Sequence, residues 1–177
     1  MARDKGRDDL LTHHERATLD GRSFPNGAHI CEVVIDPETG IVTTDRYTVV
    51  DDFGNLINPL LAEGQVHGGV VQGIGQALQE RVVYDEYGQL LTASFMDYAM
   101  PRALDVPYIS FTSEPVPSTA NIMGMKGCGE AGTVGALAAV SNAVQDALWE
   151  HGVRQADMPF TPHKVWELLQ GEAIAAE

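Results

Sequence analysis

The feature that most constrains the fold of this chain is a segment, residues 60–81, that combines helical spacing of apolar residues with five glycines. The apolar residues that recur at the interval of an amphipathic α-helix include Leu61, Val66, Val70, Ile74 and Leu78. Each interior glycine costs a helix about 1 kcal/mol relative to alanine, so this helix depends on tertiary packing. Its glycine face is expected to lie either against another helix or against a closely approaching ligand. Asn58 and Pro59 predict its start, as N-cap and first helical residue.

A second glycine-rich segment, residues 125–133, holds a single carboxylate, Glu130, and opens onto a run of small apolar residues, 134–148. A helix that starts after such a loop directs free N–H groups and its positive dipole end toward whatever the loop binds. We therefore expect the loop to bind an anionic group beside Glu130. On the residues alone, Glu130 is either a catalytic base or a carboxylate that complements the helix dipole.

The composition indicates an acidic, folded protein. The chain has 177 residues, of which 44% are hydrophobic, which suits one domain with a loose end. The net charge of −14 argues against a nucleic-acid partner, because phosphate contacts need clustered Lys and Arg. Cys31 and Cys128 form no CxxC motif, so a reducing compartment is expected. Residues 1–20 show no signal peptide and no apolar run approaches ~18 residues, so we expect a cytoplasmic protein without a membrane span.

The remaining pattern predicts strands followed by helices. The elements expected are a β-hairpin over 29–52 with a turn at 36–40, a second hairpin over 82–93, a strand over 108–113, and helices over 134–149 and 162–170. The absence of strict alternation indicates the α+β class. The acidic pair that starts at Asp51 is expected to end the first hairpin. Residues 1–22 are polar and predict a mobile arm or a weak helix, which leaves 23–177 as the domain.

Other kinds of site have weaker support in the sequence. The spacing Gly127-x-Gly129-x-x-Gly132 matches the dinucleotide fingerprint, but no strong strand precedes it and no core strand follows the predicted helix. Cys128 is either a nucleophile at the start of a helix or a structural thiol. The six histidines lack HxxxH and HExxH spacing, so we predict no metal-ligating residues in this chain.

Two motifs resemble the large subunits of the molybdenum hydroxylases, the family of xanthine dehydrogenase, aldehyde oxidase and aerobic carbon monoxide dehydrogenase. The run Lys126-Gly127-Cys128-Gly129-Glu130-Ala131-Gly132 resembles the active-site loop, and GQVHGGVVQGIGQAL at residues 64–78 resembles a second signature. The segments that fit the family in the same order are 25–29, 32–40 and 57–59. The resemblance covers residues 24–168 and is strongest to the carbon monoxide dehydrogenase-like bacterial branch.

The resemblance implies a fold and a set of roles. The fold is expected to be that of the C-terminal molybdenum-cofactor-binding domain, with Glu130 as the general base in the addition of water-derived oxygen to an electron-poor carbon. Gln65 matches a glutamine that contacts the molybdopterin. The loop whose backbone lies against the cofactor matches Lys126, Gly127, Cys128 and Gly129. Cys128 departs from the apolar residue usual there, and a small buried thiol is a tolerable substitute.

The resemblance also implies a larger assembly. Family large subunits are several-fold longer, so we expect this chain to be part of one and to be inactive alone. The rest of the large subunit is expected to share the molybdopterin, in its cytosine dinucleotide form, and a small-molecule substrate. Iron–sulfur and flavin subunits are expected to carry [2Fe-2S] clusters and FAD, because this chain has no cysteine set for a cluster.

The sequence does not select one substrate or exclude a non-catalytic function. Carbon monoxide, purines, aldehydes and N-heterocycles are all possible substrates. The alternatives to a catalytic part are a non-catalytic fragment or assembly scaffold that retains the fold without cofactor, and a free-standing nucleotide-binding module. Because a packing partner is missing, residues 64–75 are expected to expose an apolar patch in the isolated chain.

Overall fold

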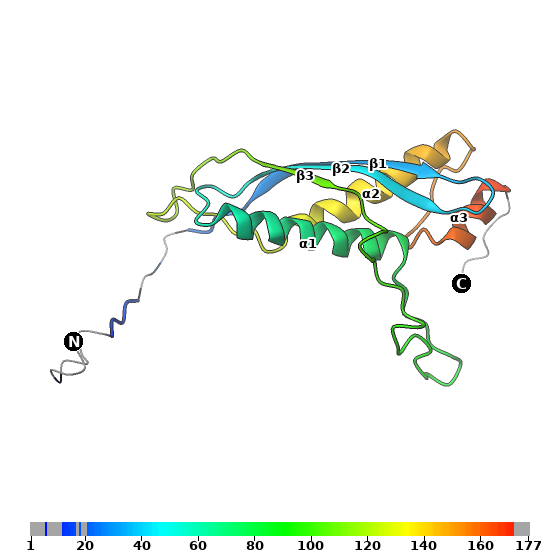
Figure 1. Cartoon of the computed structure of the whole chain (residues 1–177), viewed down its shortest axis with the longest axis horizontal. Helices are drawn as coiled ribbons and strands as arrows, with labels where there is room; N and C mark the ends of the chain where they lie inside the picture. The colour runs from blue at the N-terminus through cyan, green and yellow to red at the C-terminus, as the bar shows by residue number, and fades with distance from the viewer. Residues whose placement is uncertain (1–5, 7–11, 17, 19–20, 172–177) are drawn as a thin grey trace.

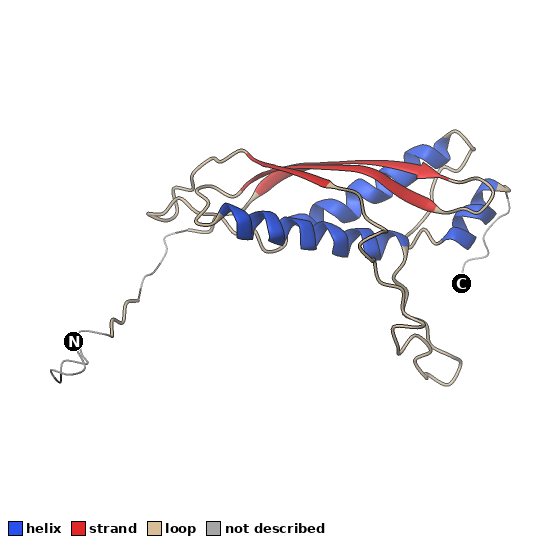
Figure 2. Ribbon diagram, viewed as in Figure 1, coloured by secondary structure: helices blue, strands red, loops and turns tan. Residues whose placement is uncertain are grey.

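The computed structural model of the chain describes residue 6, residues 12–16, residue 18 and residues 21–171. Its elements are β1 (Asn26–Ile35), β2 (Val42–Asp52), α1 (Pro59–Leu78), β3 (Ile109–Ser113), α2 (Ala131–Trp149) and α3 (Pro162–Leu169). The strands form one sheet in the order β1-β2-β3, and α1 and α2 lie against the same face of it (Figure 1, Figure 2). This small mixed sheet with helices on one face confirms the α+β class. Most of the predicted arm, 1–22, lies outside the described residues.

The hairpin predicted over 29–52 is confirmed as β1 and β2, which pair antiparallel. Its turn is built by the predicted side-chain chemistry. The Asp36 carboxylate accepts a hydrogen bond from the Thr39 hydroxyl at 2.7 Å, and Gly40 supplies a φ of 71°. The local sequence therefore specifies this part of the sheet.

The strand predicted over 108–113 is confirmed as β3, which pairs parallel with β2 from Tyr47 opposite Ile109 to Asp51 opposite Ser113. The predicted end of the hairpin at residue 52 is confirmed, because β2 ends at Asp52. The acidic pair is held in the strand by partners on other elements, as described below.

The two faces of the sheet differ in burial, as the period-two alternation of a strand requires. Tyr47 and Val49 are buried on the face that meets the helices. Ile30, Val34 and Val50 are exposed on the opposite face. The described part of the chain therefore covers one face of the sheet and leaves apolar side chains on the other.

The helix predicted over 60–81 is confirmed as α1, and Asn58 caps it as predicted, with Oδ1 accepting from the N–H of Leu61 at 3.2 Å. The predicted apolar positions are buried except Leu61, which is 69% exposed. The expected apolar patch over 64–75 is wrong, because the large apolar side chains there pack toward α2 and the sheet. The exposed apolar residues of α1 are Leu60 and Leu61, one turn earlier.

Part of the glycine face of α1 packs against α2, as one of the two predictions for this face requires. A Cβ built on Gly69 would lie 3.0 Å from the Cα of Gly132, and one built on Gly73 would lie 2.5 Å from the Cβ of Ala136. By contrast, Gly64 and Gly68 face open space, with no atom within 4 Å of a built Cβ. Close helix packing therefore accounts for two of these four glycines.

Residues 80–107 form an arm that projects from the end of α1 (Figure 1). The hairpin predicted over 82–93 is reduced there to a single bridge between Tyr84 and Leu90. The helices predicted over 134–149 and 162–170 are confirmed as α2 and α3, with α2 starting earlier than expected. Among the described residues, no helix combines the length and apolar character that crossing a bilayer requires.

Candidate functional site

The two glycine-rich segments meet at one end of the helix pair. The side-chain amide of Gln65, in α1, donates a hydrogen bond from Nε2 to the carbonyl oxygen of Gly129 at 2.8 Å. Glu130 follows directly and is the N-cap residue of α2. Gln65 and Glu130 are both exposed. The structure therefore brings these two residues together at one open surface.

The Glu130 side chain makes no capping hydrogen bond, although the residue occupies the N-cap position. Its carbonyl oxygen accepts from the N–H of Val134 at 3.0 Å, so the backbone starts the helix without the side chain. The N–H groups of the first turn of α2 consequently lack a side-chain acceptor from the cap and point toward the loop, where they can bind an anion.

Gly127 and Gly129 leave the loop backbone bare. A Cβ built on either glycine meets no atom within 4 Å, and neither takes a positive φ. Neither packing against the described residues nor backbone conformation explains these glycines, so they leave room for a ligand to approach the backbone. Cys128 between them is partly buried against the hydrophobic core, which favours the structural thiol over the nucleophile.

Lys126 does not present its side chain to this surface. Its Nζ donates to a carboxylate oxygen of Asp52, and the two side chains are only 10% and 13% exposed. Asp52 also accepts from the N–H groups of Val116 at 2.9 Å and Gly54 at 2.8 Å. The bond from Lys126 and these two backbone bonds lower the pKa of Asp52 to about 2. The side chain of Lys126 is therefore not available to a cofactor.

Two asparagines fix the loop that leads to Lys126. The Asn121 side chain donates from Nδ2 to the carbonyl oxygen of Met125 at 2.8 Å and accepts from the N–H of Met125 at 3.0 Å. Asn55, just after β2, donates from Nδ2 to the carbonyl oxygen of Met123 at 2.9 Å. These bonds join the loop to the end of the hairpin.

A buried polar cluster, not predicted from the sequence, lies on the inner face of the sheet. Nδ1 of His29 lies 2.8 Å from the Tyr47 hydroxyl, and Nε2 lies 3.5 Å from Oδ1 of Asp51. The side chains of His29 and Asp51 are 5% and 2% exposed, and burial raises the pKa of Tyr47. Strand alternation, which places all three on the inner face, was the available signal, because buried polar groups need partners.

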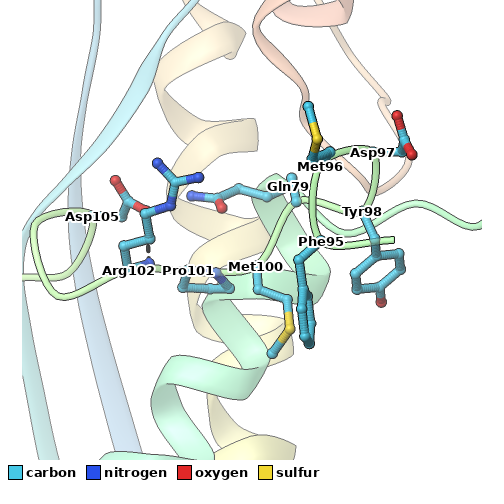
Figure 3. A pocket seen from close by; sticks show the side chains of 10 residues that line it. Gln79, Phe95, Met96, Asp97, Tyr98, Met100, Pro101, Arg102 and Asp105 are labelled. Carbon is cyan, nitrogen blue, oxygen red and sulfur yellow. Dashed lines mark hydrogen bonds between the residues drawn. The ribbon is translucent and has the colours of Figure 1, made fainter. Parts of the chain in front are cut away.

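The structure also holds a cavity of about 480 Å³ that is separate from these groups. Residues 95–102, Asp105 and Gln79 line it, and Phe95 and Met100 lie beside each other there (Figure 3). Gln79 follows the last residue of α1, so the cavity lies about 20 Å along the helix from Gln65. Among the residues that the structure describes, no three His, Cys, Asp or Glu side chains gather in a way that could hold a metal ion.

The sequence of this chain matches a family model and is similar to several known proteins. Residues 7–107 match the family described as "Molybdopterin cofactor-binding domain". The chain is 44% identical over 148 residues to the nicotine 6-hydroxylase large subunit of Paenarthrobacter nicotinovorans, covering 84% of this chain and 18% of that protein. It is 36% identical over 153 residues to the carbon monoxide dehydrogenase large chain of Hydrogenophaga pseudoflava, covering 86% of this chain and 19% of that protein.

A solved structure of a similar protein has the same fold over most of this chain. Quinoline 2-oxidoreductase from Pseudomonas putida 86 matches with a TM-score of 0.81 and 41% identity, over 84% of this chain and 19% of that chain. The chain thus spans about a fifth of the length of the relatives that it matches. These matches confirm the resemblance inferred from the two motifs. The chain belongs to the molybdopterin cofactor-binding domain family and corresponds to one segment of a molybdenum hydroxylase large subunit.

Proposed function

We propose that this chain is the segment of a molybdenum hydroxylase large subunit that presents a general base, Glu130, to the molybdopterin cofactor and the substrate. The observation that carries the proposal is the hydrogen bond from Gln65 to Gly129. It joins the two family signatures, which are 64 residues apart in the sequence, directly beside Glu130. Such a juxtaposition is what a shared cofactor contact requires.

The donor groups at this surface fit an anionic cofactor that the backbone approaches closely. Gly127 and Gly129 leave the chain bare, and the first turn of α2 directs N–H groups and a positive dipole toward the same region. The Gln65 amide retains one N–H and its carbonyl oxygen for a ligand. When bound, the cofactor would supply the two-electron redox chemistry of the reaction.

Glu130 acts as the proton acceptor in this proposal. Its carboxylate is exposed at the junction of loop and helix and is not used as a cap, so it can accept a proton from the water-derived oxygen that attacks an electron-poor carbon. A positioned general base contributes about 10²–10⁴ in rate. The simpler role, a carboxylate that complements the helix dipole, predicts no such contribution.

We further propose that the rest of the large subunit completes the cofactor site, with the cofactor in its cytosine dinucleotide form. Iron–sulfur and flavin subunits carry [2Fe-2S] clusters and FAD, and the assembly works in the cytoplasm on a small molecule. The multi-subunit assembly is supported by the name of one relative, the 6-hydroxypseudooxynicotine dehydrogenase complex subunit gamma of P. nicotinovorans, 39% identical over 150 residues. The apolar side chains on the outer sheet face are consistent with a missing neighbour.

The test is Glu130→Gln in the enzyme assembled with its partner chains. We expect turnover to fall by about 10²–10⁴ while the molybdenum content stays unchanged, because the amide keeps the shape and loses the base. Glu150→Gln, the same change at the exposed far end of α2, is the matched control and should turn over normally. Near-normal turnover of the Glu130 variant would contradict the general-base role. If the gently purified wild-type assembly contains no molybdenum, the chain is instead a non-catalytic scaffold that retains the fold without cofactor.

A further inference from the structure

We propose that Asp51 and Asp52, adjacent at the end of β2, are positioning residues that hold the two ends of residues 126–135. This inference rests on the proposed function, because Glu130 lies within that segment. Both aspartates have nearly buried side chains, whereas Glu130 and Gln65 share an open surface. Each acts through one other side chain, and each controls a different end of the segment.

Asp52 holds the loop end. Its carboxylate accepts a hydrogen bond from Nζ of Lys126, and the N–H of Lys126 in turn donates to the carbonyl oxygen of Phe53 at 2.8 Å. The same carboxylate is fixed by the N–H groups of Gly54 and Val116. A charge-assisted bond between two nearly buried groups is strong and directional, so Lys126 is tied to the strand end by both side chain and backbone.

Asp51 holds the helix end through His29. The imidazole of His29 occupies the space in front of Gly135, where a built Cβ would lie 2.4 Å from Cε1. Asp51 at one ring nitrogen and the Tyr47 hydroxyl at the other fix the ring in that position. The ring therefore acts as a spacer under the first turns of α2, and its position sets how closely the helix start approaches the sheet.

The backbone makes room for the side chain of Asp51. Gly27 lies opposite Asp51 in the β1–β2 register, and a Cβ built there would lie 1.8 Å from Oδ1 of Asp51. Successive side chains of a strand point to opposite faces, so neighbours in sequence reach different partners. One strand end can thus hold a loop and a helix start independently.

Amide hydrogen exchange of the full chain tests the two contacts separately. Asp52→Asn retains an oxygen for the Gly54 and Val116 N–H groups and loses the charge that binds Lys126. We expect exchange in residues 125–130 to become at least tenfold faster, with the centre of α2, residues 140–148, unchanged. Asp45→Asn, the same change at an exposed position of β2, is the control and should alter neither region.

The helix end has its own variant. For Asp51→Asn we expect at least tenfold faster exchange in residues 132–138 and little change in 125–130. Exchange that stays at the wild-type rate in either target region, or that rises evenly over the whole chain, overturns the inference. An even rise is the result that a merely structural role for the aspartates predicts.

A second pair of variants keeps the test valid if Asp52→Asn does not fold. Lys126→Met removes the same bond from the other side and should accelerate exchange in 125–130 at least tenfold. Lys126→Arg retains the charge and should restore most of the protection. Wild-type exchange in the methionine variant, or equal acceleration in both variants, would refute the role of the ion pair.

Molybdenum analysis separates this inference from the proposed function. In the assembled enzyme, Asp52→Asn should lower the molybdenum bound per chain at least threefold, with Asp45→Asn at the wild-type value. If the wild-type assembly itself holds no molybdenum, the proposed function fails, and the exchange data still decide whether the aspartates hold the segment. Full molybdenum content in Asp52→Asn would overturn the link between the loop contact and the cofactor.

Discussion

Gly69 of α1 and Gly132 of α2 lie so close that a Cβ built on either would be 3.0 Å from the Cα of the other. The contact is reinforced by the Thr133 hydroxyl, which donates to the carbonyl oxygen of Gly69 at 3.1 Å. It lies one turn after Gln65 and two residues after Glu130. The approach of the two helices therefore sets the separation between these site residues.

Gly132→Ala is expected to destabilise the chain by about 1–3 kcal/mol, because overpacking forces the helices apart. The added Cβ would lie 2.4 Å from the carbonyl oxygen of Val66, a backbone atom that cannot move aside alone. Gly68→Ala, on the open side of α1, should instead stabilise the chain by up to about 1 kcal/mol, because alanine favours the helix and meets no neighbour there. Urea unfolding of both variants measures the difference in the free energy of unfolding. Equal effects would show that the close contact between α1 and α2 does not exclude a side chain at residue 132.

Gln65→Leu should reduce the molybdenum content of the assembled enzyme, because it removes the amide that bonds to Gly129. The free energy of unfolding of the chain should change by only about 1 kcal/mol, as one neutral hydrogen bond is lost. Gln76→Leu, at another exposed position of α1, is the matched control. Metal analysis with equal molybdenum in both variants would argue against a cofactor contact at Gln65.

The ion pair between Lys126 and Asp52 predicts a loss of stability in acid. The pKa of Asp52 is about 2 in the folded chain, below the value of about 3.9 for an unperturbed aspartate. Because the folded pKa is the lower one, this contribution is fully present above pH ~4 and is lost as the pH falls toward 2. Denaturant unfolding from pH 7 to pH 2 should show a smaller acid loss in Asp52→Asn than in Asp45→Asn. Parallel curves for the two variants would contradict the assignment.

Cys31 should be a poorly reactive thiol in the folded chain. Burial, with a smaller effect of Glu32, raises its pKa to about 11. At pH 8 its thiolate fraction is then on the order of a hundredfold lower than that of an ordinary cysteine, and alkylation should slow accordingly. Mass spectrometry of Cys31 after timed iodoacetamide labelling, native against urea-unfolded, measures the ratio. Similar rates in both states would show that the thiol is not protected.

The sequence was sufficient for elements that local chemistry specifies. The turn at 36–40 and the cap at Asn58 depend on side chains within a few residues of the backbone that they bind, so their patterns predict them. The exposed position of Leu61 and the order of the sheet depend on contacts between distant segments. Helical spacing marks an apolar position without showing how far along the helix its packing partner extends.

Some features of the candidate site were predictable from the sequence and others were not. The motif resemblance assigned Gln65 and the loop before Glu130 to one cofactor, and the structure shows that the two are in contact. The side-chain direction of Lys126 was not predictable. Its partner, Asp52, is 74 residues away, and in sequence it is one of two adjacent acidic residues that resemble the end of a strand. A residue that positions another has no spacing rule of its own, so only the three-dimensional arrangement reveals it.

The parallel pairing of β2 with β3 has a consequence for how the chain folds. The hairpin of β1 and β2 is local, and such hairpins form in about 1–10 μs. Parallel strands need a long connection, and here it includes α1 and the projecting arm. Closing so large a loop is slow because its entropy must be lost before the contacts form. During synthesis, one edge of β2 therefore stays unpaired until β3 has been synthesised, and an unpaired strand edge favours aggregation.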